Sequence, residues 1–412
     1  MDRRAKGRIP ELDGFRALMV FLVSWYHIWQ QSWLTPHVGG VSLEFLMRAG
    51  YVPVDATILL SGFLLYLPCV TAEGRTAPAV GRFYRRRAAR ILPSFLFVTL
   101  LMLLVNHVLP LGVTIWPYNP PLWKDLLTHV TLTFTFFEDT YLASTLGGAS
   151  WTIAVEAMFY LLFPFIARLA RRRPGMTLCA MAMTAAYFRV WCLFSLRDHG
   201  MVVNQMINML DLYALGMACA MIWPHLRRLR EKTGWVRGWH WQAAATATLA
   251  LSVTGFVILM KKQAAAEQEV LQASQMVLRP LFGLCFAGMI LSLPLCVMPL
   301  RLLFGNPVTR FLSAISMNYY LLHQNIAVLL KESRVRAFLE TPRGWLGNRP
   351  ILFSEYARPY EAGDMDWQVR YTWLCIGISV LAAILVTFLI EKPCARLILH
   401  KRRPQGISAG ER

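Results

Sequence analysis

Two ionisable side chains share one face of the first apolar segment of the chain, residues 12–33. Arg16 and His27 are eleven residues apart, which in an α-helix is three turns plus about 20°, or roughly 16 Å along the axis. Asp13 falls near the same face. An ionisable group inside a spanning helix is costly and faces a polar cavity or a partner, so this spacing predicts a polar pathway ending in a titratable imidazole. The alternative is that each side chain reaches the nearer membrane interface on its own.

Carboxylates interrupt two further apolar segments. Asp55 lies near the start of the second segment, where a carboxylate can hold or orient a histidine side chain. Glu156 lies about a turn and a half into a later one, with Trp151 at its start and Tyr160 one turn further along the same face. An acid inside a membrane is functional by default, and the alternative for Glu156 is a structural acid satisfied by its neighbours.

A second histidine occupies the segment before the last. Tyr319 and Tyr320 precede His323 by four and three residues, so the three side chains form one polar stripe on a helix. That stripe can line a cavity shared with His27. The alternative is a core histidine that is hydrogen-bonded to a neighbouring hydroxyl.

An arginine cluster fills the connection between the second and third apolar segments, residues 71–90. Arg87 and Arg90 stand next to the membrane in this cluster, where arginines bind phosphates through bidentate hydrogen bonds. The alternative is that the cluster only orients the protein by its positive charge.

The composition predicts an all-α, polytopic membrane helical bundle. The chain has 412 residues, of which 56% are hydrophobic, and apolar runs of spanning length recur along it. The segment 122–138 is too short and too polar for a confident span and is predicted as an interfacial or re-entrant helix. We predict about ten transmembrane helices, at residues 12–33, 51–70, 91–109, 148–168, 176–196, 205–223, 242–260, 276–298, 310–330 and 371–390.

The positive charge predicts the orientation. A formal net charge of +19 can indicate nucleic-acid binding, but the basic residues sit in short clusters between apolar spans, as the positive-inside rule describes. These clusters share one side if both termini are cytoplasmic, which places residues 331–370 outside as a partly ordered cap. We expect residues 1–398 to form one integral-membrane domain and 399–412 a short basic cytoplasmic tail, with no appended soluble domain. The cysteines predict neither a disulfide framework nor a metal site.

These blocks, taken in order, resemble acyltransferase family 3, the integral-membrane acyltransferases of surface glycans, Nod factors and macrolides. The matching blocks are Ile9-Pro-Glu-Leu-Asp-Gly-Phe-Arg16 followed by His27, Val54-Asp55 with Leu60-Ser-Gly-Phe63, Phe83 with Arg87-Ala-Ala-Arg90-Ile-Leu-Pro93, Trp151 with Val155-Glu156 and Phe159-Tyr160, Ser316 with Tyr320 and His323, and Glu391-Lys-Pro393. Each block is weak alone, but the ordered set is highly specific.

The resemblance implies O-acyl transfer from a cytoplasmic acyl-CoA, a co-substrate rather than a bound cofactor. The acceptor would be a hydroxyl of a carbohydrate, glycolipid or polyketide sugar at the outer face of a bacterial cytoplasmic membrane, and the acyl group is expected to be acetyl. The expected catalytic residues are His27, Arg16, Glu156, Asp55 and His323; the expected substrate-binding residues are Arg87, Arg90, Asp13, Trp151, Tyr160 and Tyr320.

In the resulting mechanism His27 takes the proton of the acceptor hydroxyl as general base, or it attacks the thioester itself and forms an acyl-imidazole. Glu156 or Asp55 would orient the imidazole, and Arg16 would hold the donor's carbonyl or phosphate end. A transporter or flippase for a small glycan or lipid, and a non-catalytic membrane subunit, are the competing classes. The acyl group, the acceptor and the oligomeric state stay open.

Overall fold

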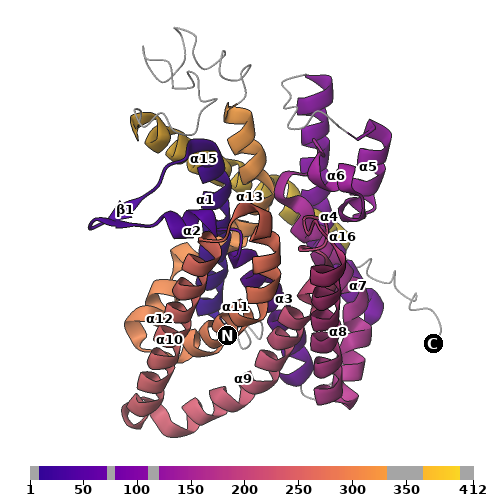
Figure 1. Cartoon of the computed structure of the whole chain (residues 1–412). Coiled ribbons are helices and arrows are strands. Elements are labelled where there is room, and N and C mark those ends of the chain that lie inside the picture. Colours follow the sequence, from indigo (N-terminus) through magenta and orange to yellow (C-terminus); the bar gives the residue numbers. More distant parts are fainter. Residues whose placement is uncertain (1–8, 72–78, 110–119, 332–364, 400–412) are drawn as a thin grey trace, which may run out of the picture.

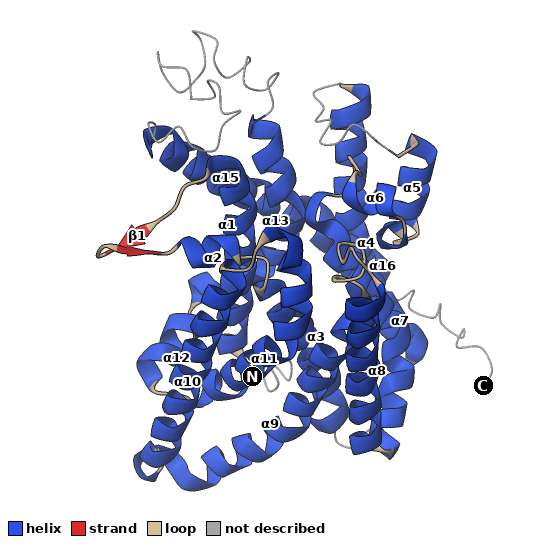
Figure 2. Ribbon diagram, viewed as in Figure 1, coloured by secondary structure: helices blue, strands red, loops and turns tan. Residues whose placement is uncertain are grey.

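A computed structural model describes residues 9–71, 79–109, 120–331 and 365–399, apart from the side chains of 233–237 and 366–367. Nearly all of this is helical (Figures 1 and 2). The one sheet within these ranges is a small hairpin, in which β1 (His37–Val38) pairs antiparallel with β2 (Val41–Ser42) and His37 lies opposite Ser42. The all-α class predicted from composition is therefore confirmed.

Long helices make up the body of the molecule and run side by side (Figure 1). They are α1 (Pro10–Ser32), α3 (Pro53–Thr71), α4 (Val80–Leu103), α7 (Trp151–Arg172), α8 (Pro174–Ser195), α9 (Leu210–Arg237), α10 (Trp239–Ala264), α11 (Leu271–Ser292), α13 (Pro307–Lys331) and α15 (Met365–Val386). Each coincides with one of the predicted spans.

Short elements connect or extend these helices. They are α2 (Glu44–Arg48), the π-helical η2 (Leu104–Val108) that continues α4, α5 (Leu122–Val130), η3 (Phe134–Phe136), α6 (Glu138–Leu142), η4 (Gly148–Ser150), η5 (Met206–Met209), η6 (Gln268–Val270), η7 (Leu293–Leu295), α12 (Met298–Gly305), the π-helical η8 (Thr387–Glu391) and α16 (Lys392–Leu399). In Figure 1, α5 and α6 lie beside the end of α4 where that helix finishes.

The bundle is a multi-pass membrane protein. Eight long helices within the described residues are long and apolar enough to cross a bilayer; α1 and α13, which carry the histidines, are the long helices outside that set. Large apolar side chains are exposed on the outside of the bundle, for example Phe194 at 88% and Leu251 at 74%. Such exposure suits helices that face lipid, where apolar side chains need no cover.

The charged connections are more helical than the sequence pattern predicted. Helix α4 begins at Val80, so the arginines between residues 82 and 90 lie on its first turns. Helix α9 continues to Arg237, beyond residue 223, where the predicted span ends. Arginine is a good helix former, and its long side chain reaches the interface from a helix that leaves the membrane. Segment 122–138 contains the short helix α5, and most of the predicted cap at 331–370 lies outside the described residues.

Glycines allow α3 and α9 to pack backbone to backbone in the centre of the bundle. A Cβ at Gly216 would lie 2.0 Å from the Leu59 carbonyl oxygen, and one at Gly62 would lie 2.5 Å from the Tyr213 carbonyl oxygen. Small residues permit this approach because association between helices in lipid depends on close van der Waals contact. The α3–α9 contact thereby fixes where Asp55 and Ser61, both on α3, stand in the bundle.

We expect Gly216→Ala to destabilise the protein by about 1–3 kcal/mol, because the added methyl group meets backbone atoms that can move only if the helices separate. Gly377→Ala on α15 is the matched control, since a Cβ there would meet nothing within 4 Å. The measurement is the fraction of detergent-solubilised protein that stays monodisperse in size-exclusion chromatography after heating. Equal survival of the two variants would contradict a tight α3–α9 interface.

Candidate active site

The two intramembrane histidines contact each other directly. Nδ1 of His27 on α1 lies 2.8 Å from Nε2 of His323 on α13, and the ring centroids are 5.0 Å apart. His323 is fully buried, whereas His27 is partly exposed. His323, the last residue of the predicted stripe, therefore contacts His27.

The neighbouring groups fix which nitrogens carry protons. Nδ1 of His323 lies 3.2 Å from the carbonyl oxygen of Tyr319, and since a carbonyl only accepts, this nitrogen donates. In a neutral imidazole the other nitrogen is then the acceptor, so Nδ1 of His27 donates to Nε2 of His323. This assignment follows from the network, as tautomers in proteins must. It leaves the lone pair of His27 on Nε2, away from His323.

Hydroxyl groups and aromatic rings surround the histidine pair. The Ser24 hydroxyl lies 2.7 Å from the Tyr319 hydroxyl, a second polar link between α1 and α13. The Tyr320 ring centroid is 5.4 Å from that of His323. Trp151, at the start of α7, packs against the same group of buried side chains as Tyr319 and Tyr320. The predicted substrate-binding residues Trp151 and Tyr320 thus lie around the pair.

A second polar group forms around Glu156 on α7. Its carboxylate accepts hydrogen bonds from the Ser61 hydroxyl of α3 at 2.8 Å and from the Tyr160 hydroxyl at 2.9 Å. The Arg87 guanidinium stands over the Tyr160 ring, 5.2 Å from its centroid, and 5.6 Å from that of Phe83. The Glu156 carboxylate therefore joins α7 to α3, and Arg87 of α4 packs beside it on Tyr160.

The remaining predicted cations lie close to this carboxylate. Arg16 interacts electrostatically with Glu156, Asp13 and Arg90. Arg87 has a buried Nε that donates to no group in the part of the chain that the structure describes, and Arg90 is exposed on α4. We call Arg16, Arg87, Arg90, Glu156 and Tyr160 the arginine–glutamate cluster. Arg16 is the member of this cluster that lies on α1. His27 lies eleven residues further along the same face of that helix.

Asp55 does not hold the His27 imidazole, so that expected contact is wrong. The buried Asp55 carboxylate accepts from Nε of Arg279 on α11 at 3.0 Å, and Nη1 of Arg279 donates to the Val203 carbonyl oxygen at 2.5 Å. Two buried charges in an apolar bundle pair because an unpaired one is strongly destabilising. The Glu156 carboxylate likewise has other partners, the hydroxyls of Ser61 and Tyr160. The His27 ring is therefore oriented by His323 and not by a carboxylate.

The sequence reasoning missed two buried arginines. Arg279 is fully buried with Asp55, and Arg189 on α8 bonds Asp211 at 2.6 Å and Asn208 at 2.7 Å. The available signal was a charged residue inside an apolar run, the same signal that singled out Arg16. Their partners lie on other helices, so the sequence alone did not show with what they pair.

The chain matches a model of the family described as "Acyltransferase domain" over residues 9–390. Acyltransferase MdmB of Streptomyces mycarofaciens is 29% identical over 187 residues, which are 43% of this chain and 45% of that protein. Peptidoglycan O-acetyltransferase OatA of Listeria monocytogenes is 25% identical over 176 residues, or 39% of this chain and 24% of that protein. O-acetyltransferase OatA of Staphylococcus aureus is 23% identical over 233 residues, or 52% and 35%.

These alignments cover less than half the length of each of these relatives. No solved structure matches the chain. The family match is nevertheless continuous across the bundle, and it includes both histidines and the arginine–glutamate cluster. The chain belongs to this acyltransferase family.

Proposed function

We propose that the protein is an integral-membrane O-acyltransferase that moves an acyl group from acyl-CoA to a hydroxyl of a carbohydrate, glycolipid or polyketide sugar. The observation that carries the proposal is the His27–His323 hydrogen bond, which leaves a lone pair on Nε2 of His27. Family membership gives the reaction class. Acetyl is the acyl group we expect, because two relatives are named O-acetyltransferases.

His27 acts on the acceptor in this proposal. Nε2 takes the proton of the acceptor hydroxyl while the oxygen attacks the thioester carbonyl, the carbon–sulfur bond breaks, and CoA leaves as a thiol after it receives the proton. Alternatively Nε2 attacks the thioester first, the carbon–sulfur bond breaks and CoA leaves as a thiolate. The acceptor hydroxyl then attacks the acyl-imidazole, the bond to Nε2 breaks, and the proton of the hydroxyl goes to the thiolate. Both routes need Nε2 of His27 to be unprotonated. His323 favours that tautomer because its Nε2 accepts a hydrogen bond from the Nδ1–H of His27.

The arginine–glutamate cluster holds the donor. Arg87 and Arg90 would bind the phosphates of CoA, because guanidinium groups form bidentate charge-assisted hydrogen bonds with them. The buried Nε of Arg87, which has no hydrogen-bond partner among the described residues, supports this role. A donor held there needs a long, thin arm to bring its thioester about 16 Å along α1 to His27, and the pantetheine arm of CoA has that form.

The distribution of basic residues supports the orientation. We place the arginine–glutamate cluster on the cytoplasmic side and His27 toward the outer side of a bacterial cytoplasmic membrane, with about ten spans and both termini cytoplasmic. Eight spans follow from length and composition, and α1 and α13 complete the set in this proposal. Their lower hydropathy reflects the polar residues that they carry into the bundle interior.

We expect His27→Ala to abolish acyl transfer, and His323→Ala to lower kcat by about 10²-fold or more, since a positioned base contributes roughly 10²–10⁴. Activity is measured as acyl transfer from labelled acyl-CoA in membranes, and folding as the size-exclusion profile. His225→Ala is the control, because that imidazole is exposed and its hydrogen bond within the described residues goes to the Met221 carbonyl. Normal activity of the His27 variant would contradict the mechanism.

We expect Arg87→Ala and Arg90→Ala to raise the KM for acyl-CoA while leaving kcat nearly unchanged, because they lose phosphate contacts made equally in the ground and transition states. Arg85→Ala and Arg86→Ala are matched controls from exposed positions on the same helix. If the Arg87 and Arg90 variants invert the topology without changing donor use, orientation is their whole role.

Donor and acceptor are identified together by incubating membranes with labelled acyl-CoAs, extracting glycans and lipids, and reading the products by mass spectrometry. We expect one acyl group to appear as an ester on a sugar hydroxyl, dependent on His27. Glycan or lipid movement across vesicles without any acyl-CoA, together with no acylated product, would instead support a transporter.

A further inference from the structure

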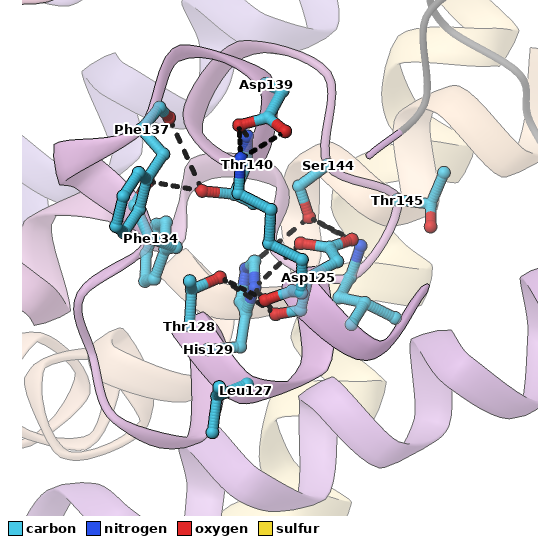
Figure 3. Close-up of polar contacts among 12 residues, drawn as sticks. Asp125, Leu127, Thr128, His129, Phe134, Phe137, Asp139, Thr140, Ser144 and Thr145 are labelled. Atoms are coloured by element: carbon cyan, nitrogen blue, oxygen red, sulfur yellow. Dashed lines mark hydrogen bonds and ion pairs between the residues drawn. The ribbon is translucent and has the colours of Figure 1, made fainter. Parts of the chain in front are cut away.

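A histidine–carboxylate pair lies outside the His27 site, in the segment between α4 and α7 (Figure 3). His129 Nδ1 lies 3.0 Å from Oδ1 of Asp125, one turn earlier on α5, and 2.9 Å from the Asp125 carbonyl oxygen. Both side chains are buried, with exposed fractions of 0% and 2%. The imidazole stacks on the Phe134 ring, with centroids 4.2 Å apart. Its position and ring orientation are therefore fixed.

Ser144 completes the group from the loop between α6 and η4. Because both oxygens near His129 Nδ1 are acceptors, the proton of the neutral ring lies on Nδ1 and the lone pair on Nε2. Nε2 lies 3.5 Å from the Ser144 hydroxyl oxygen. Figure 3 shows Ser144 directed toward both Asp125 and His129. Acid, base and hydroxyl therefore stand in the order that activates a serine nucleophile, with the long spacing common before substrate binds.

In this structure the Ser144 hydroxyl is hydrogen-bonded to the Asp125 carboxylate. It donates to Asp125 Oδ2 at 3.0 Å and accepts from the Leu146 amide at 3.0 Å. Rotation of the O–H bond alone redirects the proton toward His129 Nε2, without moving the backbone. Ser144 is partly exposed, unlike Asp125 and His129, so the reactive oxygen is the accessible member of the group.

The loop around Ser144 is held in place on both sides. Asn106 on η2 donates to the Thr145 carbonyl oxygen at 2.6 Å. A Cβ at Gly147 would lie 2.5 Å from His129 Nε2, so only glycine lets the loop pass this close to the imidazole. Gly148 has a φ of +49° and its backbone approaches Asn325, two residues beyond His323. This loop thus joins the Ser144 group to the helix that carries the histidine pair.

We infer that Ser144, His129 and Asp125 form a second reactive site, a serine nucleophile that takes an acyl group from carboxylic esters or thioesters. The serine oxygen bonds the acyl carbon as its proton moves to His129 Nε2, and the alcohol or thiol leaves with that proton. Water, or a second hydroxyl, then breaks the new ester with the proton moving in reverse. Nothing in this step requires His27, so the inference stands apart from the proposed function.

A fluorophosphonate probe tests the inference on the purified full chain in detergent, without knowledge of the natural substrate. The serine oxygen displaces fluoride at phosphorus, and peptide mass spectrometry locates the adduct. We expect labelling at Ser144 that is lost in Ser144→Ala and His129→Gln. Ser150→Ala is the matched control, since its buried hydroxyl lies in the same loop and its loss leaves the adduct in place.

The wild-type result decides the question even if His129→Gln does not fold, because it needs no variant. An unlabelled wild-type chain, or labelling that persists in Ser144→Ala, would overturn the inference. His27→Ala should label as the wild type does, while its acyl transfer from acyl-CoA is lost. Failure of the second site and failure of the proposed function therefore give different results.

Discussion

The hydrogen bond between His27 and His323 is the interaction on which the candidate site depends. It joins α1 to α13 and holds the partly exposed imidazole of His27 against the fully buried imidazole of His323. Because His323 also donates to a backbone carbonyl, the bond has a direction, and that direction decides which nitrogen of His27 is basic. A backbone carbonyl on α13 therefore sets the chemistry of a side chain on α1.

The same physical constraint organises the other charged groups. An ion in a low-dielectric interior needs a partner with good geometry, and two ion pairs within the described residues meet this need: Asp55 with Arg279, and Arg189 with Asp211. Glu156 is instead held by two hydroxyls, with arginines nearby rather than in direct contact. The arginines of the arginine–glutamate cluster therefore place positive charge beside Glu156, and such charge favours the binding of an anionic ligand.

Most of the long helices were predictable from their apolar runs. The predicted spans coincide with the long helices, because a run of apolar residues in lipid has to satisfy its backbone within a helix. The errors lie at the ends: α4 starts at Val80 and α9 continues to Arg237, past the point where the apolar signal stops. A search for apolar runs stops at charged residues. Arginine and glutamate nevertheless have high helix propensity, so the helix continues through them.

By itself, the sequence determined that Arg16 and His27 share one face of α1, because a helical repeat is a local property. It also placed Tyr319, Tyr320 and His323 on one stripe of α13 for the same reason. Only the tertiary structure decided partners: His323 rather than Asp55 for His27, Arg279 for Asp55, and Ser144 for His129. Hydrogen bonds between distant segments depend on how helices pack, and no periodicity within one helix encodes which neighbour it meets.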